Sequence, residues 1–193
     1  MSSNPHDFKK EIFRKSIHAS GLFFLPLLFL NKFIFSGLFV LFLGIYFLIE
    51  LLDRKNIRLP FLTSITHISK RDNEKNLWAR GPIFLSLSCA FLPLVFSASH
   101  TCLGLVHIFV SDSAAALIGM KWGNKKIPFS PRKSWAGSIA YFISAFLISL
   151  FWISPTQALL LAVAGSFLEM LPIKDADNLT IPWGIAFLAS FSQ

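Results

Sequence analysis

Cysteine and the common catalytic and nucleotide-binding patterns are scarce in this chain. Cysteine occurs twice, at Cys89 and Cys102, and both positions lie in apolar stretches, which favours small hydrophobic side chains over a disulfide framework or a metal site. The phosphate-binding loop GxxxxGKS or GxxxxGKT is missing, as are the Ser, His and Asp order of a hydrolase and the Cys and His spacing of a zinc enzyme. A nucleotide site in this chain must therefore have another design.

The chain is unusually rich in hydrophobic residues. Hydrophobic residues make up 54% of its 193 positions, 22 of them phenylalanine, and the mean hydropathy is +0.61. A soluble core of this size could not bury so much apolar surface. We therefore predict an all-α membrane protein, folded as one integral domain over residues 1–193.

Seven apolar segments are candidates for membrane-spanning helices, which need about 20 apolar residues each. They predict a polytopic helical bundle of about seven transmembrane helices, with cytoplasmic loops at about 53–80, 121–134 and 172–180. The first and last segments are short, so either the helices extend into their polar flanks or the last one does not cross fully. The segments run over about 17–30, 33–52, 81–96, 101–120, 135–153, 156–171 and 181–191.

The distribution of basic residues predicts the orientation of these segments. Seventeen of the 18 Lys and Arg residues lie before the first segment or in the three cytoplasmic loops, and Lys32 is the exception. The positive-inside rule then places the N-terminus in the cytoplasm of a multi-pass protein of the cell membrane. The net charge of +8 belongs to one membrane face, so we expect no nucleic-acid partner. Apolar residues at helical spacing in 59–76 predict an interfacial helix, or else a basic loop that binds anionic lipid.

Asp112 lies inside the fourth apolar segment, where a carboxylate costs about 2.5–3.5 kcal/mol on insertion scales. Such an acid is a candidate for function. The small residues Ala115, Ala116 and Gly119 lie at helical spacing on the same face and leave space beside it. The alternative is a packing face for a neighbouring helix, with Asp112 hydrogen-bonded for a structural purpose.

A second acid, Glu169, ends the sixth segment on a face of small residues, and Asp177 and Asn178 follow it. Hard oxygen ligands that leave room for phosphate suit Mg²⁺. We therefore predict Asp112, Glu169 and Asp177 as metal ligands. The alternative is a solvated loop, with Glu169 merely extending to the interface.

The sequence SPRKSWAGS, at the start of the fifth segment, predicts a phosphate-binding element. Ser134 can cap the following helix, whose first free backbone N–H groups then face the cytoplasmic boundary. A helix N-terminus with adjacent cations, here Arg132 and Lys133, binds phosphate. A basic loop that simply obeys the positive-inside rule is the alternative.

Three motifs carry a resemblance to a known family. They are RKSIHASG at 14–21, SDSAAALIGMKWGNKKIPFSPRKSWAGS at 111–138 and EMLPIKDADNLTIP at 169–182. Together they resemble the CTP-dependent polyprenol kinase family, which includes dolichol, phytol and yeast-type diacylglycerol kinases. The resemblance implies a multi-pass enzyme of the lipid bilayer that transfers the γ-phosphate of CTP to an isoprenoid alcohol or diacylglycerol, with CTP as co-substrate and Mg²⁺ as cofactor.

The resemblance also implies roles for individual residues. Asp112 takes the position of the family's acid and is the predicted catalytic residue, as a base or as a metal ligand. Two positions depart from the family pattern: Ser111 stands where Gly is common, and Ala136 stands where Glu is common. The predicted nucleotide- and phosphate-binding residues are Gly119, Lys121, Gly123, Arg132, Lys133 and Ser134, and the further site candidates are Arg14, Lys15, His18, Arg80 and Asn178.

Three other functions are open alternatives. The middle motif is also similar to phosphatidate cytidylyltransferases, although nothing after Gly137 supplies their Gly-His-Gly-Gly turn. A small membrane carrier could use Asp112 and Glu169 as an intramembrane binding pair. A non-catalytic membrane subunit would fit the absence of the family's Glu at Ala136. The tail motif favours the kinase.

Overall fold

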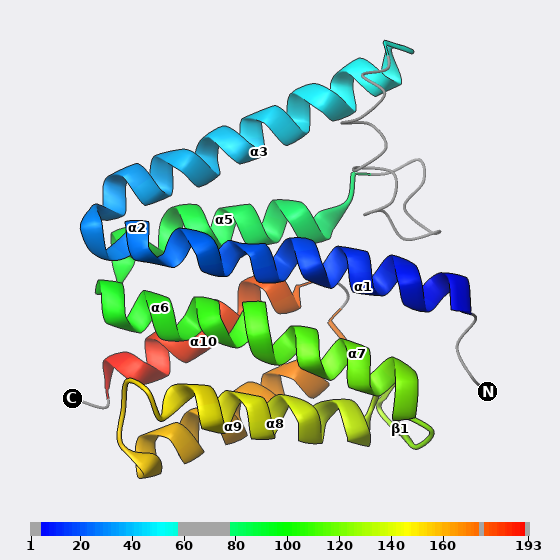
Figure 1. Cartoon of the computed structure of the whole chain (residues 1–193), viewed down its shortest axis with the longest axis vertical. Coiled ribbons are helices and arrows are strands. Elements are labelled where there is room, and N and C mark those ends of the chain that lie inside the picture. Colours follow the sequence, from blue (N-terminus) through cyan, green and yellow to red (C-terminus); the bar gives the residue numbers. More distant parts are fainter. Residues whose placement is uncertain (1–4, 58–77, 174–175, 192–193) are drawn as a thin grey trace.

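The structure is a computed structural model that describes residues 5–57, 78–173 and 176–191 (Figure 1). Within these ranges the fold is an all-α bundle with one short β-hairpin, which confirms the all-α part of the predicted fold class. The segment 59–76, with its predicted interfacial helix or basic loop, lies outside the described residues. The elements in order are α1 (Pro5–Ser20), η1 (Gly21–Phe24), α2 (Leu25–Leu30), α3 (Lys32–Arg54), α5 (Arg80–Val95), α6 (Ala98–Val106), η3 (His107–Ser111), α7 (Asp112–Trp122), β1 (Lys126–Ile127), β2 (Ser130–Ser134), α8 (Trp135–Ser149), α9 (Pro155–Met170) and α10 (Asp177–Ser190).

Several helices join end to end into longer rods. α1, η1 and α2 continue one another, and so do α6, the π-helical η3 and α7. The rods Phe8–Leu30, Lys32–Arg54 and Ala98–Trp122 are long and apolar enough, by length and composition, to cross a membrane. The other rods in the described ranges, α5, α8, α9 and α10, have 14 to 16 residues. Each predicted segment therefore coincides with a helical rod, and the number of seven spans stays a prediction.

Polar residues between the apolar segments begin several helices. Asn31, in an extended conformation, accepts hydrogen bonds from the backbone N–H groups of Phe33 and Ile34, so one residue separates α2 from α3. Ser97 and Ser154 cap α6 and α9 in the same way. Each cap satisfies N–H groups that have no partner within their helix, which matters most where water is scarce.

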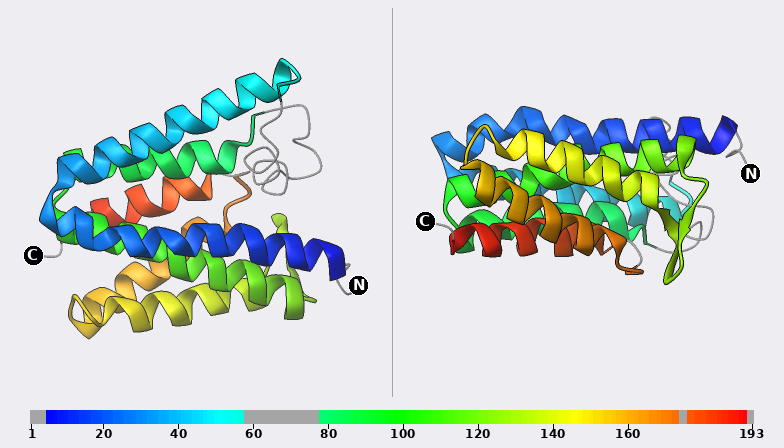
Figure 2. Two further views of the ribbon diagram at one scale, coloured as in Figure 1. Left: turned by 45° about the horizontal axis from the view of Figure 1, so that its top comes forward. Right: turned by 90° about the horizontal axis from the view of Figure 1, so that it is seen from below.

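Two groups of packed helices make up the bundle. α10 packs against α5, α6 and α9, and its Ile181 and Ile185 are fully buried. α7 packs on α8, and α8 on α9 (Figure 2). The α7–α8 contact requires Gly137, because a Cβ there would lie 2.8 Å from the carbonyl oxygen of Ala115. α3 packs on α5 and α2 and diverges from α1 (Figure 1).

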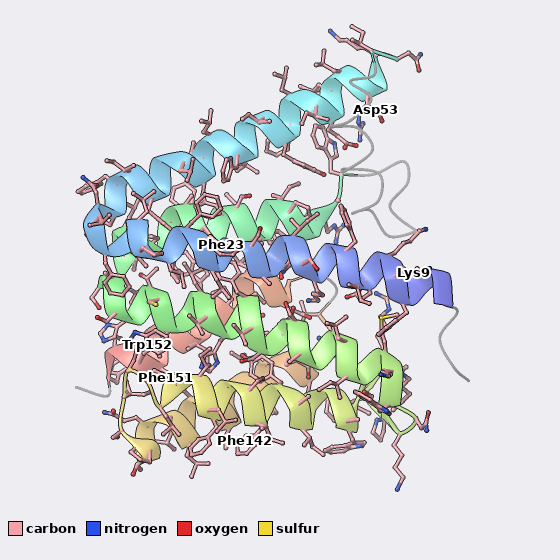
Figure 3. The ribbon with its side chains drawn as sticks, in the orientation of Figure 1. Lys9, Phe23, Asp53, Phe142, Phe151 and Trp152 are labelled. Carbon is pink, nitrogen blue, oxygen red and sulfur yellow. The ribbon has the colours of Figure 1, made fainter. Side chains whose placement is uncertain are left out.

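The elements that carry basic residues meet at one end of the bundle, which we call the basic end. The beginnings of α1, α5 and α8, the end of α7 and the β-hairpin lie there, whereas Lys32 begins α3 at the opposite end (Figure 1). Phe151 and Trp152, between α8 and α9, also lie at the opposite end, far from Lys9 (Figure 3). In the described residues, the basic side chains that the sequence groups by loop therefore gather at one end of the bundle.

Candidate active site

A cavity of about 900 Å³ lies at the basic end of the bundle. The cavity is lined by residues of α1, η1, α3, α5, η3, α7, β1, β2, α8, α9 and α10, and its lining has a charged part and an apolar part. One space thus joins a polar region to a hydrocarbon-lined region. The charged wall consists of Lys15, Asp112, Lys133, Glu169 and Asp177, and the apolar arm consists of Gly21, Phe24, Phe39, Leu85 and Phe109.

Asp112, the predicted catalytic residue, starts α7 and forms a buried ion pair with α1. Lys15 Nζ donates a hydrogen bond to Asp112 Oδ2. The two residues are 6% and 4% exposed, so little water screens the pair. Lys15 thereby balances the charge that makes a lone carboxylate costly in hydrocarbon. Lys15, which was predicted as a site residue only from the family resemblance, is therefore the direct partner of Asp112.

Lys133, near the end of β2, lies between one acid of α9 and one acid of α10. Its Nζ is 2.6 Å from Asp177 Oδ2 and 3.0 Å from Glu169 Oε1. Ser138 Oγ donates a hydrogen bond of 2.7 Å to the other carboxylate oxygen of Glu169. Burial opposes the charged form of Lys133, but the nearby carboxylates, Asp177 foremost, outweigh it, and the pKa of Lys133 lies above its ordinary value. The ammonium group is therefore held in its charged form.

The β-hairpin carries the predicted phosphate-binding element to the cavity. β1 pairs antiparallel with β2, and α8 begins directly after Ser134. Ser134 Oγ accepts a hydrogen bond of 3.2 Å from the N–H of Gly137, which confirms the predicted cap. Arg132 and Lys133 line the cavity immediately before this helix start. Two cations and a helix N-terminus thus lie on the same side of the cavity.

Two glycines that were predicted to bind phosphate have a packing role in the structure. A Cβ at Gly119 would lie 3.0 Å from Ser134 Oγ, and a Cβ at Gly123 would overlap the same side chain. Gly119 lines the cavity, whereas Gly123 is outside its described lining. Both glycines let the end of α7 pack against the start of α8, and this packing fixes the position of the phosphate-binding element.

Asn178 joins the start of α10 to α5. Its Nδ2 donates a hydrogen bond of 2.9 Å to the carbonyl oxygen of Gly81, and Ser88 Oγ donates one of 2.7 Å to the carbonyl oxygen of Asn178. Asn178 is buried and lines the cavity beside Asp177. These bonds fix the first turn of α10, and with it the Asp177 carboxylate that faces Lys133.

Most of the predicted site residues meet in this cavity, although they come from five separate elements. Arg80 is exposed at the start of α5, outside the described lining. Lys121 is also outside that lining, with its ammonium 4.5 Å from the centroid of the Trp122 ring. The predicted residues that line the cavity are Arg14, Lys15, His18, Asp112, Gly119, Arg132, Lys133, Ser134, Glu169, Asp177 and Asn178.

The predicted metal ligands carry the oxygen donors that Mg²⁺ prefers. In the part of the chain that the structure describes, however, no three His, Cys, Asp or Glu side chains gather closely enough to hold an ion. Asp112 is bonded to Lys15, and Glu169 and Asp177 share Lys133. An ion at Glu169 and Asp177 therefore requires Lys133 to turn to other anions, such as phosphate oxygens. Magnesium stays a prediction.

Ser138 is a site residue that the sequence analysis did not single out. It is buried on α8, and its hydroxyl orients the Glu169 carboxylate toward Lys133. It follows the predicted cap Ser134 by four residues, so both lie on one face of the helix. That spacing, already present in the motif SPRKSWAGS, is the signal that would have found it.

Comparisons with known proteins identify the family. The model of the family described as "Cytidylyltransferase family" matches residues 22–191. The chain is 31% identical over 139 residues to "Probable phytol kinase, chloroplastic" of Triticum aestivum and 32% identical over 133 residues to "Phytol kinase 1, chloroplastic" of Arabidopsis thaliana. It is 30% identical over 146 residues to "Phytol kinase" of Synechocystis sp.. No solved structure matches the chain.

The three alignments differ in how much of each protein they cover. They span 62%, 58% and 68% of this chain, but only 46%, 43% and 60% of the wheat, Arabidopsis and Synechocystis proteins. The chain thus spans about half the length of the relatives that it matches. The predicted resemblance to polyprenol and phytol kinases is confirmed by these relatives together with the family model. Because that model covers the chain from η1 to the end of α10, this protein belongs to the cytidylyltransferase family.

Proposed function

We propose that this protein is a lipid-alcohol kinase that transfers the γ-phosphate of CTP to a membrane-embedded isoprenoid alcohol. The observation that carries the proposal is the single cavity in which the charged wall adjoins the apolar arm. A phosphate donor and a hydrocarbon acceptor need these two surroundings and must meet in one space. The phytol kinases among the relatives support a lipid-alcohol acceptor, and the family description and the motif resemblance support CTP.

The donor end of the site is the beginning of α8 with the two cations before it. Arg132 and Lys133 can each donate charge-assisted hydrogen bonds to phosphate oxygens, and the first N–H groups of α8 add partial positive charge. Phosphate binding would draw Lys133 away from Glu169 and Asp177, with which it now pairs. Asp112, Glu169 and Asp177 are then the residues that would hold Mg²⁺, whose charge offsets that of the phosphates.

The charge of the lining supports an anionic donor. Basic groups outnumber acidic groups there, five to four, before any ligand is bound. A nucleotide with several negative charges therefore meets a cavity lining that is net positive as a whole. The basic residues are Arg14, Lys15, Lys126, Arg132 and Lys133, and the acidic residues are Glu11, Asp112, Glu169 and Asp177.

The acceptor end of the site is the apolar arm. Aromatic side chains from three elements line it, and Asp112 of the charged wall follows Phe109 of the arm by three residues on the same rod. Beside the arm α1 and α3 diverge (Figure 1), and Ile17 and Phe42, which line the cavity on these helices, are 40% and 37% exposed. We propose that the lipid enters from the bilayer between α1 and α3 and places its hydroxyl beside Asp112.

The transfer is an in-line displacement at phosphorus, for which the protein mainly positions the reactants and stabilises charge. The acceptor oxygen forms a bond to the γ-phosphorus while the bond from that phosphorus to the bridging oxygen breaks. CDP leaves with the electron pair of the broken bond. Asp112 is placed to accept or orient the hydroxyl proton, and Lys15 keeps its carboxylate fixed.

The position of the label that enters the lipid separates this kinase from a cytidylyltransferase. Purified protein in lipid nanodiscs, given Mg²⁺, CTP and a prenol such as phytol or geranylgeraniol, should move γ-label and not α-label into the lipid and release CDP. Diacylglycerol in the same panel tests the acceptor, and ATP in place of CTP tests the donor. The variant Asp112→Asn controls for contaminating kinases. If α-label enters the lipid only when phosphatidic acid is supplied, with release of pyrophosphate, the kinase proposal is wrong.

We also propose that the seven helical rods cross the membrane with the basic end in the cytoplasm. A cysteine in place of Asn31, exposed at the opposite end, should then react with a membrane-impermeant maleimide added to intact cells. A cysteine in place of Asn124, exposed after α7, should react only after the cells are permeabilised. Cys89 and Cys102 are buried, so background labelling should be low. Reaction at position 124 in intact cells would reverse the proposed orientation.

A further inference from the structure

A π-helical turn lies directly before the central acid. Across the stretch His107–Ser111, the N–H of Asp112 bonds to the carbonyl oxygen of His107, five residues back. Such a turn holds one residue more than an α-helical turn, is rare, and is often found at functional sites. α6 and α7 on either side are α-helical, so this one turn sets the direction in which Asp112 points relative to α6.

The side chain of His107 anchors this turn to α8. The residue is fully buried, and both of its ring nitrogens have partners: Nδ1 lies 3.2 Å from Tyr141 Oη, and Nε2 lies 2.9 Å from Ser149 Oγ. The two partners are eight residues apart, so the imidazole bridges about 12 Å of α8. No partner of His107 is evident in the sequence, because both partners lie on a later helix.

α8, which binds the side chain of His107, also contacts the charged wall. Gly165 on α9 makes room for Tyr141, since a Cβ there would lie 2.7 Å from Tyr141 Oη. One turn further along α9, Glu169 accepts the hydrogen bond of Ser138, which precedes Tyr141 by three residues on α8. The π turn and the charged wall are therefore packed on the same part of α8.

We propose that His107 is a positioning residue for Asp112. Its bonds to Tyr141 and Ser149 hold the π turn, and the turn directs the Asp112 carboxylate into the cavity toward Lys15. Without this anchor the segment can relax to an α-helix, which would rotate Asp112 by about 100° relative to α6. An apolar side chain would fill the position of His107 without polar atoms to satisfy, so packing alone does not explain the network.

The activity test compares variants of the network with a matched control on α8, and it rests on the proposed function. Tyr141→Phe should lower kcat roughly tenfold and His107→Phe roughly a hundredfold, with KM for the nucleotide changed less than about threefold. His107→Gln, which keeps hydrogen-bonding groups, should recover most of the loss. Ser144→Ala removes a hydroxyl that bonds to the backbone of its own helix and should leave kcat unchanged.

A purely structural role predicts a different outcome in the same experiment. The melting temperature and yield of the network variants would fall, while kcat per folded molecule stayed at the wild-type value. His107→Gln would then show no rescue of kcat, because there would be no loss to rescue. That result would overturn the positioning role.

A second measurement reports the direction of residue 112 without turnover. In a background without the two native cysteines, Asp112→Cys should be labelled through the cavity by a small water-soluble thiol reagent. Adding Tyr141→Phe or His107→Phe should slow this labelling roughly tenfold, because access of the reagent governs the rate once the thiol turns away. Labelling at Arg132→Cys, in the same lining, should not change and shows that the cavity is still open.

The two readouts separate this inference from the proposed function. If the wild-type protein transfers no phosphate but labelling at position 112 falls in the network variants, the kinase proposal fails and the positioning role stands. If the protein is active and neither kcat nor labelling responds, the positioning role fails and the kinase stands. A loss of kcat with unchanged labelling would also overturn the positioning role.

Discussion

Replacement of Asp112 by Asn is expected to lower phosphate transfer to the lipid by about 10³-fold, within the range that general-base catalysis contributes. The substitution keeps the size of the side chain and removes its negative charge. The site then has neither the proton acceptor nor the anionic oxygen that this position supplies. Lys15 also loses its ion-pair partner in a buried place.

The measurement is γ-phosphate transfer per folded molecule, with the folded fraction taken from size-exclusion chromatography and thermal unfolding. Asp53→Asn is the matched control, because it removes an acid from the last turn of α3, outside the described lining of the cavity. The double variant Lys15→Met, Asp112→Asn leaves no unpaired charge and should be stable but equally inactive. Near-normal turnover in Asp112→Asn would remove this residue from the chemistry.

Lys133→Met is expected to lower γ-phosphate transfer by roughly 10- to 150-fold, the equivalent of about 1.5–3 kcal/mol for one charge-assisted phosphate contact. It also leaves the carboxylates of Glu169 and Asp177 without the cation that lies 3.0 Å and 2.6 Å from them. The two acids then repel each other, so the melting temperature should fall as well. Adding Glu169→Gln should raise the melting temperature again without restoring transfer.

Lys125→Met is the matched control for Lys133→Met. It removes the same charge from the same loop, but Lys125 is exposed and outside the described lining of the cavity. Transfer by this variant should change by less than about threefold, as is usual for surface substitutions. Equal losses in the two variants, measured over a range of CTP concentrations, would show that the general charge of the loop and not a contact from Lys133 supports activity.

The helical rods were predictable because apolar length is a property of consecutive residues. The predicted segments 33–52 and 101–120 lie within the rods Lys32–Arg54 and Ala98–Trp122, which differ from them by a few residues at each end. The first rod begins at Pro5 and not near 17, because a helix can continue into its polar flank once its apolar part is stable. Hydropathy indicates where an apolar segment begins, but it does not indicate where the helix begins.

The acids and cations of the site were predictable for a related reason. A charge inside or at the edge of an apolar run is costly, so Asp112, Glu169 and Lys133 stand out from their neighbours. Their pairing was not predictable from one sequence. Lys15 and Asp112 are 97 residues apart, and only the packing of α1 against η3 and α7 brings them together.

The π turn could not be predicted from the sequence for a more specific reason. A helical wheel assigns faces by assuming 3.6 residues per turn, and one wider turn at His107–Ser111 changes the phase of everything beyond it. The face of Asp112 and Ala115 was assigned correctly because both lie after the turn, in α7. His107 lies within the wider turn, and its partners on the later helix α8 were not evident from one sequence.

The unequal lengths of the rods give the protein two hydrophobic thicknesses. α3 has 23 residues and α8 has 15, which correspond to about 35 Å and about 22 Å along their axes, against about 30 Å of bilayer hydrocarbon. If α3 and α8 both cross the membrane, as we propose, the surrounding bilayer becomes thinner beside α8 and keeps its full depth beside α3. In the proposed reaction, this thinning brings bulk water toward the start of α8 and Lys133, while the tail of the lipid acceptor stays in deep hydrocarbon beside α3. Bilayers of shorter-chain lipids should therefore fit the α8 side with less deformation, and enzyme turnover should depend on acyl chain length even at constant substrate.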